Sequence, residues 1–146
     1  MEKIASFQKD HDKLQPGLYA QTDKNLITTF DLRFKKPNSG DYITPKALHT
    51  IEHLLATVLR NSEKKDDIVY FGPMGCRTGF YLLTVRLCFE EVLALLKESI
   101  KKALTLEEVP GSKREECGNY LEHDLAAAKE ELTNYLLILD GVEAHS

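Results

Sequence analysis

Two histidines and a glutamate lie in the pattern H-x-x-E-H, at His49, Glu52 and His53. On an α-helix, residues four apart project from one face and lie about 6 Å apart along the axis, so both imidazoles can reach one metal ion. Glu52 projects from nearly the same face, which suits a base beside the metal better than a ligand. The alternative is a helix whose histidines only line the edge of a core.

Two histidines leave a metal site incomplete, and Cys117 is the best candidate for a third ligand. It lies in a loop just before the predicted last helix, where a helix N-terminus would favour the thiolate. Two histidines and one cysteine, with a fourth position open to water or substrate, form a known type of catalytic zinc site.

The other two cysteines have different expected roles. Cys76 follows the turn Gly72-Pro73-Met74-Gly75, which is typical of a loop at the surface and favours a chemical role for the thiol. Cys88 falls within a predicted strand, and we expect it to be buried as a small hydrophobic residue.

A helix over residues 45–60 is expected to position the histidines. Thr44 is a good N-cap and Pro45 suits the first helical position. Apolar residues then recur every three or four positions, which predicts a stripe facing the core: Leu48, Ile51, Leu54, Leu55, Val58 and Leu59. The histidines flank this stripe, so we expect a half-sheltered site at the edge of the core.

The remaining pattern predicts strands first and long helices later. We expect strands at residues 17–20, 25–34, 67–71 and 79–89, and further helices at residues 90–103 and 120–139. The residues expected to face the core from the last helix are Leu121, Leu125, Ala128, Leu132, Tyr135 and Leu139. Because strands and helices do not alternate strictly, this order favours an α+β fold with an antiparallel sheet.

The chain's 146 residues are expected to form one domain, residues 1–146, large enough to bury a core without disulfides. The net charge of −4 is mild and no basic stripe is present, so we expect no nucleic-acid partner. No apolar run approaches the length of a membrane span, and the N-terminus lacks an apolar targeting segment. We therefore expect a cytoplasmic protein, and three cysteines, an odd number, then favour free thiols over a disulfide framework.

The sequence as a whole resembles the S-ribosylhomocysteine lyases, the LuxS family. The most specific shared blocks are H-x-x-E-H and Pro73-Met74-Gly75-Cys76 followed by R-T-G-F-Y at residues 77–81. The other matching segments are residues 2–11 with Ser6-Phe7 and Asp10-His11, F-D-L-R-F at 30–34, Pro37-Asn38, Val109-Pro110, E-C-G at 116–118 and H-D-L at 123–125.

The resemblance implies an antiparallel sheet packed against helices, and a homodimer with active sites at the interface. It assigns His49, His53 and Cys117 as metal ligands and Glu52 and Cys76 as acid/base residues. Ser6, His11 and Arg33 correspond to positions that contact the substrate. The family's metal is expected to be Fe²⁺, with Zn²⁺ or Co²⁺ able to occupy the site.

The implied reaction converts S-ribosylhomocysteine to homocysteine and 4,5-dihydroxy-2,3-pentanedione, the precursor of autoinducer-2. The carbonyl would migrate along the ribose by successive enolisations before β-elimination of the thiol, and each enolisation needs a Lewis acid and a base. Some neighbouring residues depart from the commoner family pattern: Tyr70, Phe71, Gly72, Asn119, Tyr120, Ala126 and Ala127. None of these departures removes a group with a named role.

Two rival interpretations are weaker. H-x-x-E-H also occurs in inverted-zincin metallopeptidases, but their third ligand is typically a downstream glutamate and they need an extended cleft. A structural metal site normally has four protein ligands, often in paired C-x-x-C spacing, and this chain has no such pair.

Overall fold

Four strands form one antiparallel sheet in the order β1-β2-β4-β3. The computed structural model describes residues 10–142. The strands are β1 (Gly17–Thr22), β2 (Ile27–Arg33), β3 (Ile68–Pro73) and β4 (Gly79–Val85). The order of predicted strands and helices favoured an α+β fold with an antiparallel sheet, and the structure confirms this.

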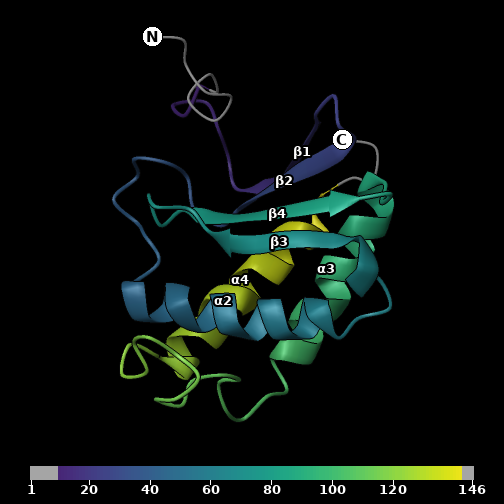
Figure 1. The fold of residues 1–146 in the computed structure, drawn as a ribbon. Coiled ribbons are helices and arrows are strands. Elements are labelled where there is room, and N and C mark those ends of the chain that lie inside the picture. Colours follow the sequence, from purple (N-terminus) through teal and green to yellow (C-terminus); the bar gives the residue numbers. More distant parts are fainter. Residues whose placement is uncertain (1–9, 143–146) are drawn as a thin grey trace, which may run out of the picture.

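Three α-helices among the described residues cover one face of this sheet (Figure 1). They are α2 (Pro45–Arg60), α3 (Phe89–Ala103) and α4 (Leu125–Asp140), and a short 3₁₀ helix, η1 (Lys65–Asp67), precedes β3. Within the described part of the chain, no helix is both long and apolar enough to cross a membrane.

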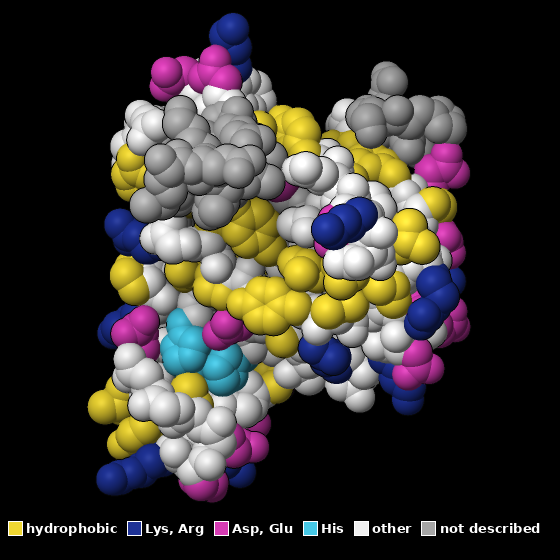
Figure 2. Space-filling view, turned by 45° about the horizontal axis from the view of Figure 1, so that its top comes forward, with side chains coloured by type: hydrophobic (Ala, Val, Ile, Leu, Met, Phe, Trp, Pro, Cys, Tyr) yellow, Lys and Arg dark blue, Asp and Glu magenta, His cyan; other side chains and the backbone are white. Residues whose placement is uncertain are grey.

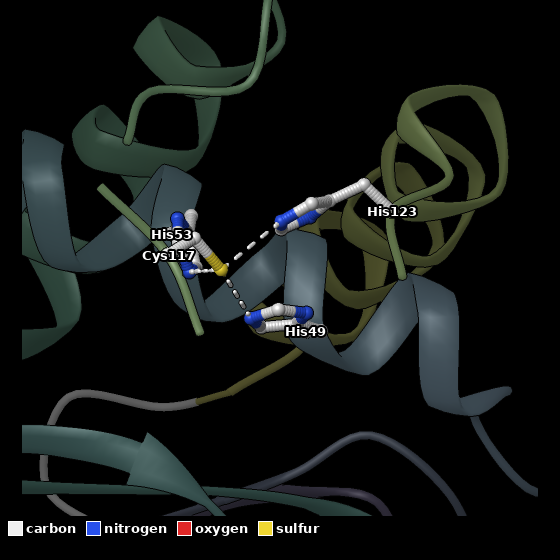
Figure 3. A group of neighbouring side chains, drawn as sticks. All are labelled: His49, His53, Cys117 and His123. Atoms are coloured by element: carbon white, nitrogen blue, oxygen red, sulfur yellow. Dashed lines mark hydrogen bonds between the residues drawn. The ribbon is translucent and has the colours of Figure 1, made fainter. Parts of the chain in front are cut away.

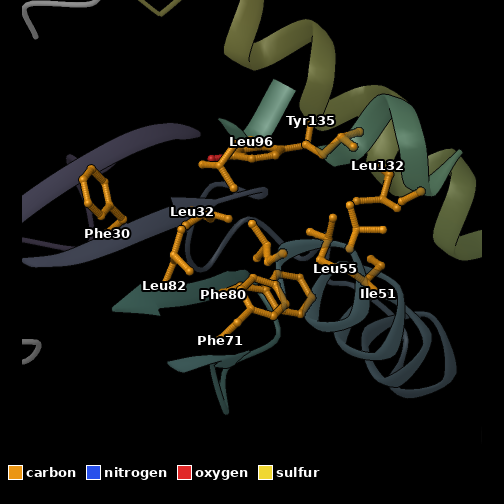
Figure 4. Packing of buried hydrophobic residues seen from close by; sticks show 14 of the residues in the cluster. Phe30, Leu32, Ile51, Leu55, Phe71, Phe80, Leu82, Leu96, Leu132 and Tyr135 are labelled. Carbon is orange, nitrogen blue, oxygen red and sulfur yellow. The ribbon is translucent and has the colours of Figure 1, made fainter. Parts of the chain in front are cut away.

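The core lies between the sheet and the helices. Figure 4 shows Ile51 and Leu55 of α2 packed toward the stacked rings of Phe71 and Phe80. Tyr135 of α4 closes the other side, because its ring stacks on Phe34 and its hydroxyl donates to the Gly17 carbonyl oxygen at 2.8 Å. One continuous core therefore holds α2 rigidly against the sheet.

Helix α2 begins as predicted. The Thr44 hydroxyl accepts a hydrogen bond from the Ala47 backbone N–H at 3.3 Å, and Pro45 occupies the first turn. The predicted apolar stripe is buried, apart from Leu48, which is half-buried. His49 and His53 flank this stripe and are half-buried, so the expected placement at the edge of the core is confirmed.

Strand β4 is shorter than predicted, and this corrects the environment of Cys88. Arg86 has a φ of 60°, a left-handed conformation that ends the strand after Val85. Cys88 is then the N-cap of α3, and it is exposed rather than buried in a strand. Its backbone N–H donates to Glu91, which completes a capping box.

Strand β2 and helix α4 both begin later in the chain than predicted. Leu26 has a φ of 65° and is exposed in the turn before β2, where we expected a strand. Helix α4 begins at Leu125 rather than near Tyr120, because the Asp124 carboxylate caps it by accepting from the Ala127 N–H. Leu121 is consequently exposed in a loop instead of facing the core.

Candidate metal centre

His49 and His53 project from α2 toward one point. Their ring centroids are 4.7 Å apart. The Nδ1 atom of His49 donates to the Glu122 carbonyl oxygen at 2.8 Å, and that of His53 donates to the Pro110 carbonyl oxygen at 2.8 Å. Because a carbonyl oxygen only accepts, each Nδ1 carries the proton and each Nε2 presents a lone pair, as a metal ligand must.

The thiol of Cys117 lies between the two Nε2 atoms (Figure 3). Its Sγ is 3.5 Å from Nε2 of His49 and 3.8 Å from Nε2 of His53. Tetrahedral zinc with ordinary Zn–N and Zn–S bond lengths would separate nitrogen and sulfur ligands by about 3.5 Å. The donor types and their spacing therefore suit one divalent metal ion.

The structure brings Cys117 to the histidines from a loop, although the last helix begins later than expected. Helix α4 starts at Leu125, eight residues after Cys117. A turn holds the cysteine, in which the Cys117 N–H donates to the Lys113 carbonyl oxygen. Gly111, with a φ of +65°, lets the same loop pass close to the His53 ring.

His123 is a fourth member of the group, and the sequence analysis gave it no role. Its ring stacks on His49 with centroids 4.1 Å apart, and its Nε2 lies 3.9 Å from Sγ of Cys117. Possible ligand atoms of His49, His53, Cys117 and His123, which we call the His–Cys cluster, all lie within 4.8 Å of one another. The signal available in the sequence was the H-D-L block six residues after Cys117.

Burial lowers the pKa of His123 below its ordinary value, and the neighbouring His49 and His53 lower it further. This shift favours the neutral form of the His123 ring, which has one N–H and one lone pair.

Glu52 is half-buried on α2 beside His53. Among the described residues, no hydrogen bond or ion pair involves its carboxylate. A carboxylate without a structural partner remains available to take or give a proton.

Cys76 lies in a separate pocket of about 420 Å³ at the turn between β3 and β4. His11 and Arg33, two of the three residues expected to contact substrate, also line it. Ser6, the third, lies outside the described residues. The remaining lining residues of this Cys76 pocket are Pro37, Asn38, Tyr42, Pro73, Met74, Gly75, Thr78 and Tyr81.

Arg33 is buried and held by other side chains. It pairs with the Asp31 carboxylate through two hydrogen bonds of 3.1 and 2.7 Å, and it donates to the Thr78 hydroxyl oxygen at 2.7 Å. Thr78 Oγ1 is in turn 3.0 Å from Sγ of Cys76. Arg33 therefore supports Cys76 through Thr78, in addition to lining the pocket.

Arg77, which follows Cys76 in the sequence, is engaged elsewhere. Its guanidinium lies over the Tyr42 ring and donates to the Ile43 carbonyl oxygen. The cation linked to Cys76 in the structure is therefore Arg33 rather than its sequence neighbour.

The third group beside the histidine pair is a cysteine, which argues against the peptidase interpretation. In the described residues, the cluster that can hold a metal contains His49, His53, Cys117 and His123 and no glutamate. The downstream glutamate typical of such peptidases is absent from this cluster.

The family model for S-Ribosylhomocysteinase (LuxS) matches residues 4–143 of the chain. The S-ribosylhomocysteine lyase of Borreliella afzelii (strain PKo) is 46% identical, covering 98% of this chain and 96% of that protein. The S-ribosylhomocysteine lyase of Finegoldia magna is 41% identical over 98% of this chain and 95% of its own length. The one from Phocaeicola vulgatus is 46% identical over 93% and 89%, respectively. With its histidine pair and cysteine at metal-binding spacing, the chain belongs to the LuxS family of S-ribosylhomocysteine lyases.

Proposed function

We propose that this protein cleaves the thioether bond of S-ribosylhomocysteine, releasing homocysteine and 4,5-dihydroxy-2,3-pentanedione, the precursor of autoinducer-2. The observation that carries the proposal is the arrangement of His49, His53 and Cys117 at tetrahedral spacing. Glu52 lies beside His53 on the same helix, and its carboxylate has no partner within the described part of the chain. The three relatives described above, which match over most of their length, are named S-ribosylhomocysteine lyases.

His49, His53 and Cys117 would hold one divalent metal ion per subunit, Fe²⁺ by expectation, with Zn²⁺ or Co²⁺ as substitutes. When bound there, the metal would supply Lewis acidity to the sugar oxygens. Three protein ligands would leave a position for substrate, as in catalytic rather than structural sites.

Glu52 and Cys76 would carry the protons. Moving a carbonyl along the ribose requires a proton to leave one carbon and another to be returned to its neighbour, so two acid/base groups on different sides of the sugar suit the reaction. Glu52 has no hydrogen-bond or ion-pair partner among residues 10–142, and Cys76 opens into a pocket large enough for part of a small substrate. His11, Arg33 and Ser6 would contact that substrate.

A homodimer would unite these groups. In one chain, the Cys76 pocket shares no described residue with the His–Cys cluster. Figure 2 shows hydrophobic side chains in a band across one face, with histidine side chains beside it. Tyr70 is exposed and Tyr81 and Leu83 are half-exposed on the side of the sheet opposite the helices. Pairing across this surface would bring the Cys76 pocket of one copy to the cluster of the other.

Thiol release tests the proposal directly. The metal-loaded protein is given S-ribosylhomocysteine, and free homocysteine is measured with a thiol reagent while peptide hydrolysis is assayed in parallel. We expect stoichiometric thiol and dihydroxypentanedione and no peptide cleavage. Peptide cleavage without thiol release would overturn the proposal. The cytoplasmic location predicted from the N-terminal sequence and the lack of a long apolar run stays a prediction.

A further inference from the structure

His123 has two possible relations to the proposed metal site, and its ring nitrogens decide between them. If Nε2 carries the lone pair, His123 is a fourth protein ligand and the site is closed. If Nε2 carries the proton, it donates to the Cys117 sulfur, 3.9 Å away, and the site keeps an open position. The partner of Nδ1 therefore determines which arrangement exists.

That partner is the hydroxyl of Thr50, at 3.0 Å from Nδ1. Thr50 is fully buried on α2. Its oxygen also accepts a hydrogen bond from the Asp124 backbone N–H, at 2.9 Å. No third partner of this hydroxyl occurs in the described part of the chain, so its own proton has one place to go, which is Nδ1 of His123.

The opposite arrangement leaves a buried donor without a partner. If Nδ1 carried the proton, Thr50 would accept from both His123 and Asp124, and its hydroxyl proton would have no acceptor among the described residues. Buried donors in folded proteins are nearly always satisfied. His49 and His53 differ because their Nδ1 atoms face carbonyl oxygens, which cannot donate.

We infer that His123 is a positioning residue that donates its Nε2–H to the Cys117 sulfur, in the tautomer opposite to that of His49 and His53. The hydrogen-bonded chain runs from the Asp124 N–H to Thr50, from the Thr50 hydroxyl to His123, and from His123 to Cys117. This inference rests on the metal site of the proposed function and deepens it.

The hydrogen bond has two consequences for the site. It lowers the electron density that the Cys117 thiolate can donate to a metal, so a bound ion remains a stronger Lewis acid. It also keeps His123 out of the coordination sphere, so the fourth position stays available to the substrate.

The tautomer is measured by long-range ¹H–¹⁵N correlation spectra of the Zn²⁺-loaded protein labelled with ¹⁵N-histidine. We expect His49 and His53 to be protonated at Nδ1 and His123 at Nε2. An unprotonated, metal-shifted Nε2 of His123 would overturn the inference. This measurement uses the unmodified protein, so it does not depend on a variant that folds.

Cobalt binding provides the second test, with His123→Ala compared with the unmodified protein. We expect one equivalent of Co²⁺ in both, similar visible d–d intensity, and a sulfur-to-cobalt charge-transfer band at lower energy in His123→Ala. Thr50→Val should shift the band in the same direction, whereas the matched control Thr50→Ser, which keeps the hydroxyl, should leave it in place. Loss of stoichiometric cobalt in a folded His123→Ala protein would make His123 a ligand and contradict the inference.

These readouts are separate from turnover. If thiol release is absent but Nε2 of His123 is protonated beside a bound metal, the proposed reaction fails and the role of His123 stands. If thiol is released normally and His123 ligates the metal, the reaction stands and this inference fails.

Discussion

The side chains of the His–Cys cluster come from α2 and the loop before α4, whereas the Cys76 pocket lies at the ends of β2, β3 and β4. In the cluster, backbone carbonyl oxygens accept hydrogen bonds from both His49 and His53. In the pocket, a chain of hydrogen-bonded side chains runs from Asp31 through Arg33 and Thr78 to the Cys76 thiol. The first arrangement could hold an ion in place, and the second supports one exposed thiol at a pocket.

The two regions therefore suit two different tasks. A metal site needs ligands whose positions vary little, and main-chain hydrogen bonds provide that. A thiol that transfers protons would instead have to meet the substrate, and Cys76 is exposed at a pocket. Variants in the His–Cys cluster should lose the metal, and variants in the Cys76 pocket should lose only proton transfer. Comparing the two sets tests whether the two regions have these different tasks.

The largest expected effect is in the cluster. His49→Ala, His53→Ala and Cys117→Ala should each lose bound metal and with it all measurable activity, since two remaining ligands hold an ion poorly. Metal content of the purified variants after dialysis, together with thiol release, measures both losses. Stoichiometric metal in Cys117→Ala would exclude that thiol as a ligand.

Cys76→Ala should lose activity while keeping its bound metal. We expect it to fold and bind metal normally but to release thiol roughly 10²–10⁴-fold more slowly, the range for removing a positioned acid/base group. Cys88→Ala is the matched control, because Cys88 is also exposed but lies at the N-cap of α3 away from the pocket. Equal rates for the two variants would remove Cys76 from the mechanism.

Glu52→Gln tests the base in the cluster region. The amide keeps the shape of the side chain while removing the basic oxygen, so metal should stay bound and turnover should fall by roughly 10²–10⁴-fold. Metal analysis beside steady-state kinetics checks this. Failure to bind metal would show that Glu52 is a ligand rather than a base.

Thr78→Val should have a smaller effect. It breaks the link between Arg33 and Cys76 without touching either group, so we expect kcat to fall roughly two- to tenfold, equivalent to one hydrogen bond of about 0.5–1.5 kcal/mol. Thr78→Ser keeps the hydroxyl and should retain activity. An unchanged kcat in a folded Thr78→Val protein would mean that this link does not serve Cys76.

Features that depend only on residues close together in the sequence could be predicted from it. Thr44, Pro45 and the histidine pair follow helical rules that depend on neighbours four residues apart, and the structure agrees with them. Cys88 and Leu121 were misplaced because each depends on a boundary set elsewhere: the left-handed Arg86 ends β4, and the Asp124 cap starts α4 late.

The role of His123 and the support for Cys76 were harder to predict because they depend on tertiary contacts. Thr50 and His123 are 73 residues apart in the chain. Thr78 and Arg33 are 45 residues apart, and Arg77, the obvious neighbour of Cys76, is turned toward Tyr42. No local pattern specifies such pairs, since they form only when the loop and the sheet edges pack.

Mixing two inactive variants tests most directly whether the two regions belong to one reaction across two copies of the chain. Cys76→Ala and Cys117→Ala are unfolded together, refolded as mixed dimers, loaded with metal, and assayed for thiol release. If each active site combines the cluster of one copy with the pocket of the other, half the dimers are mixed and each holds one intact site, so roughly a quarter of the unmodified activity should return. No recovery of thiol release in verified mixed dimers would contradict this account.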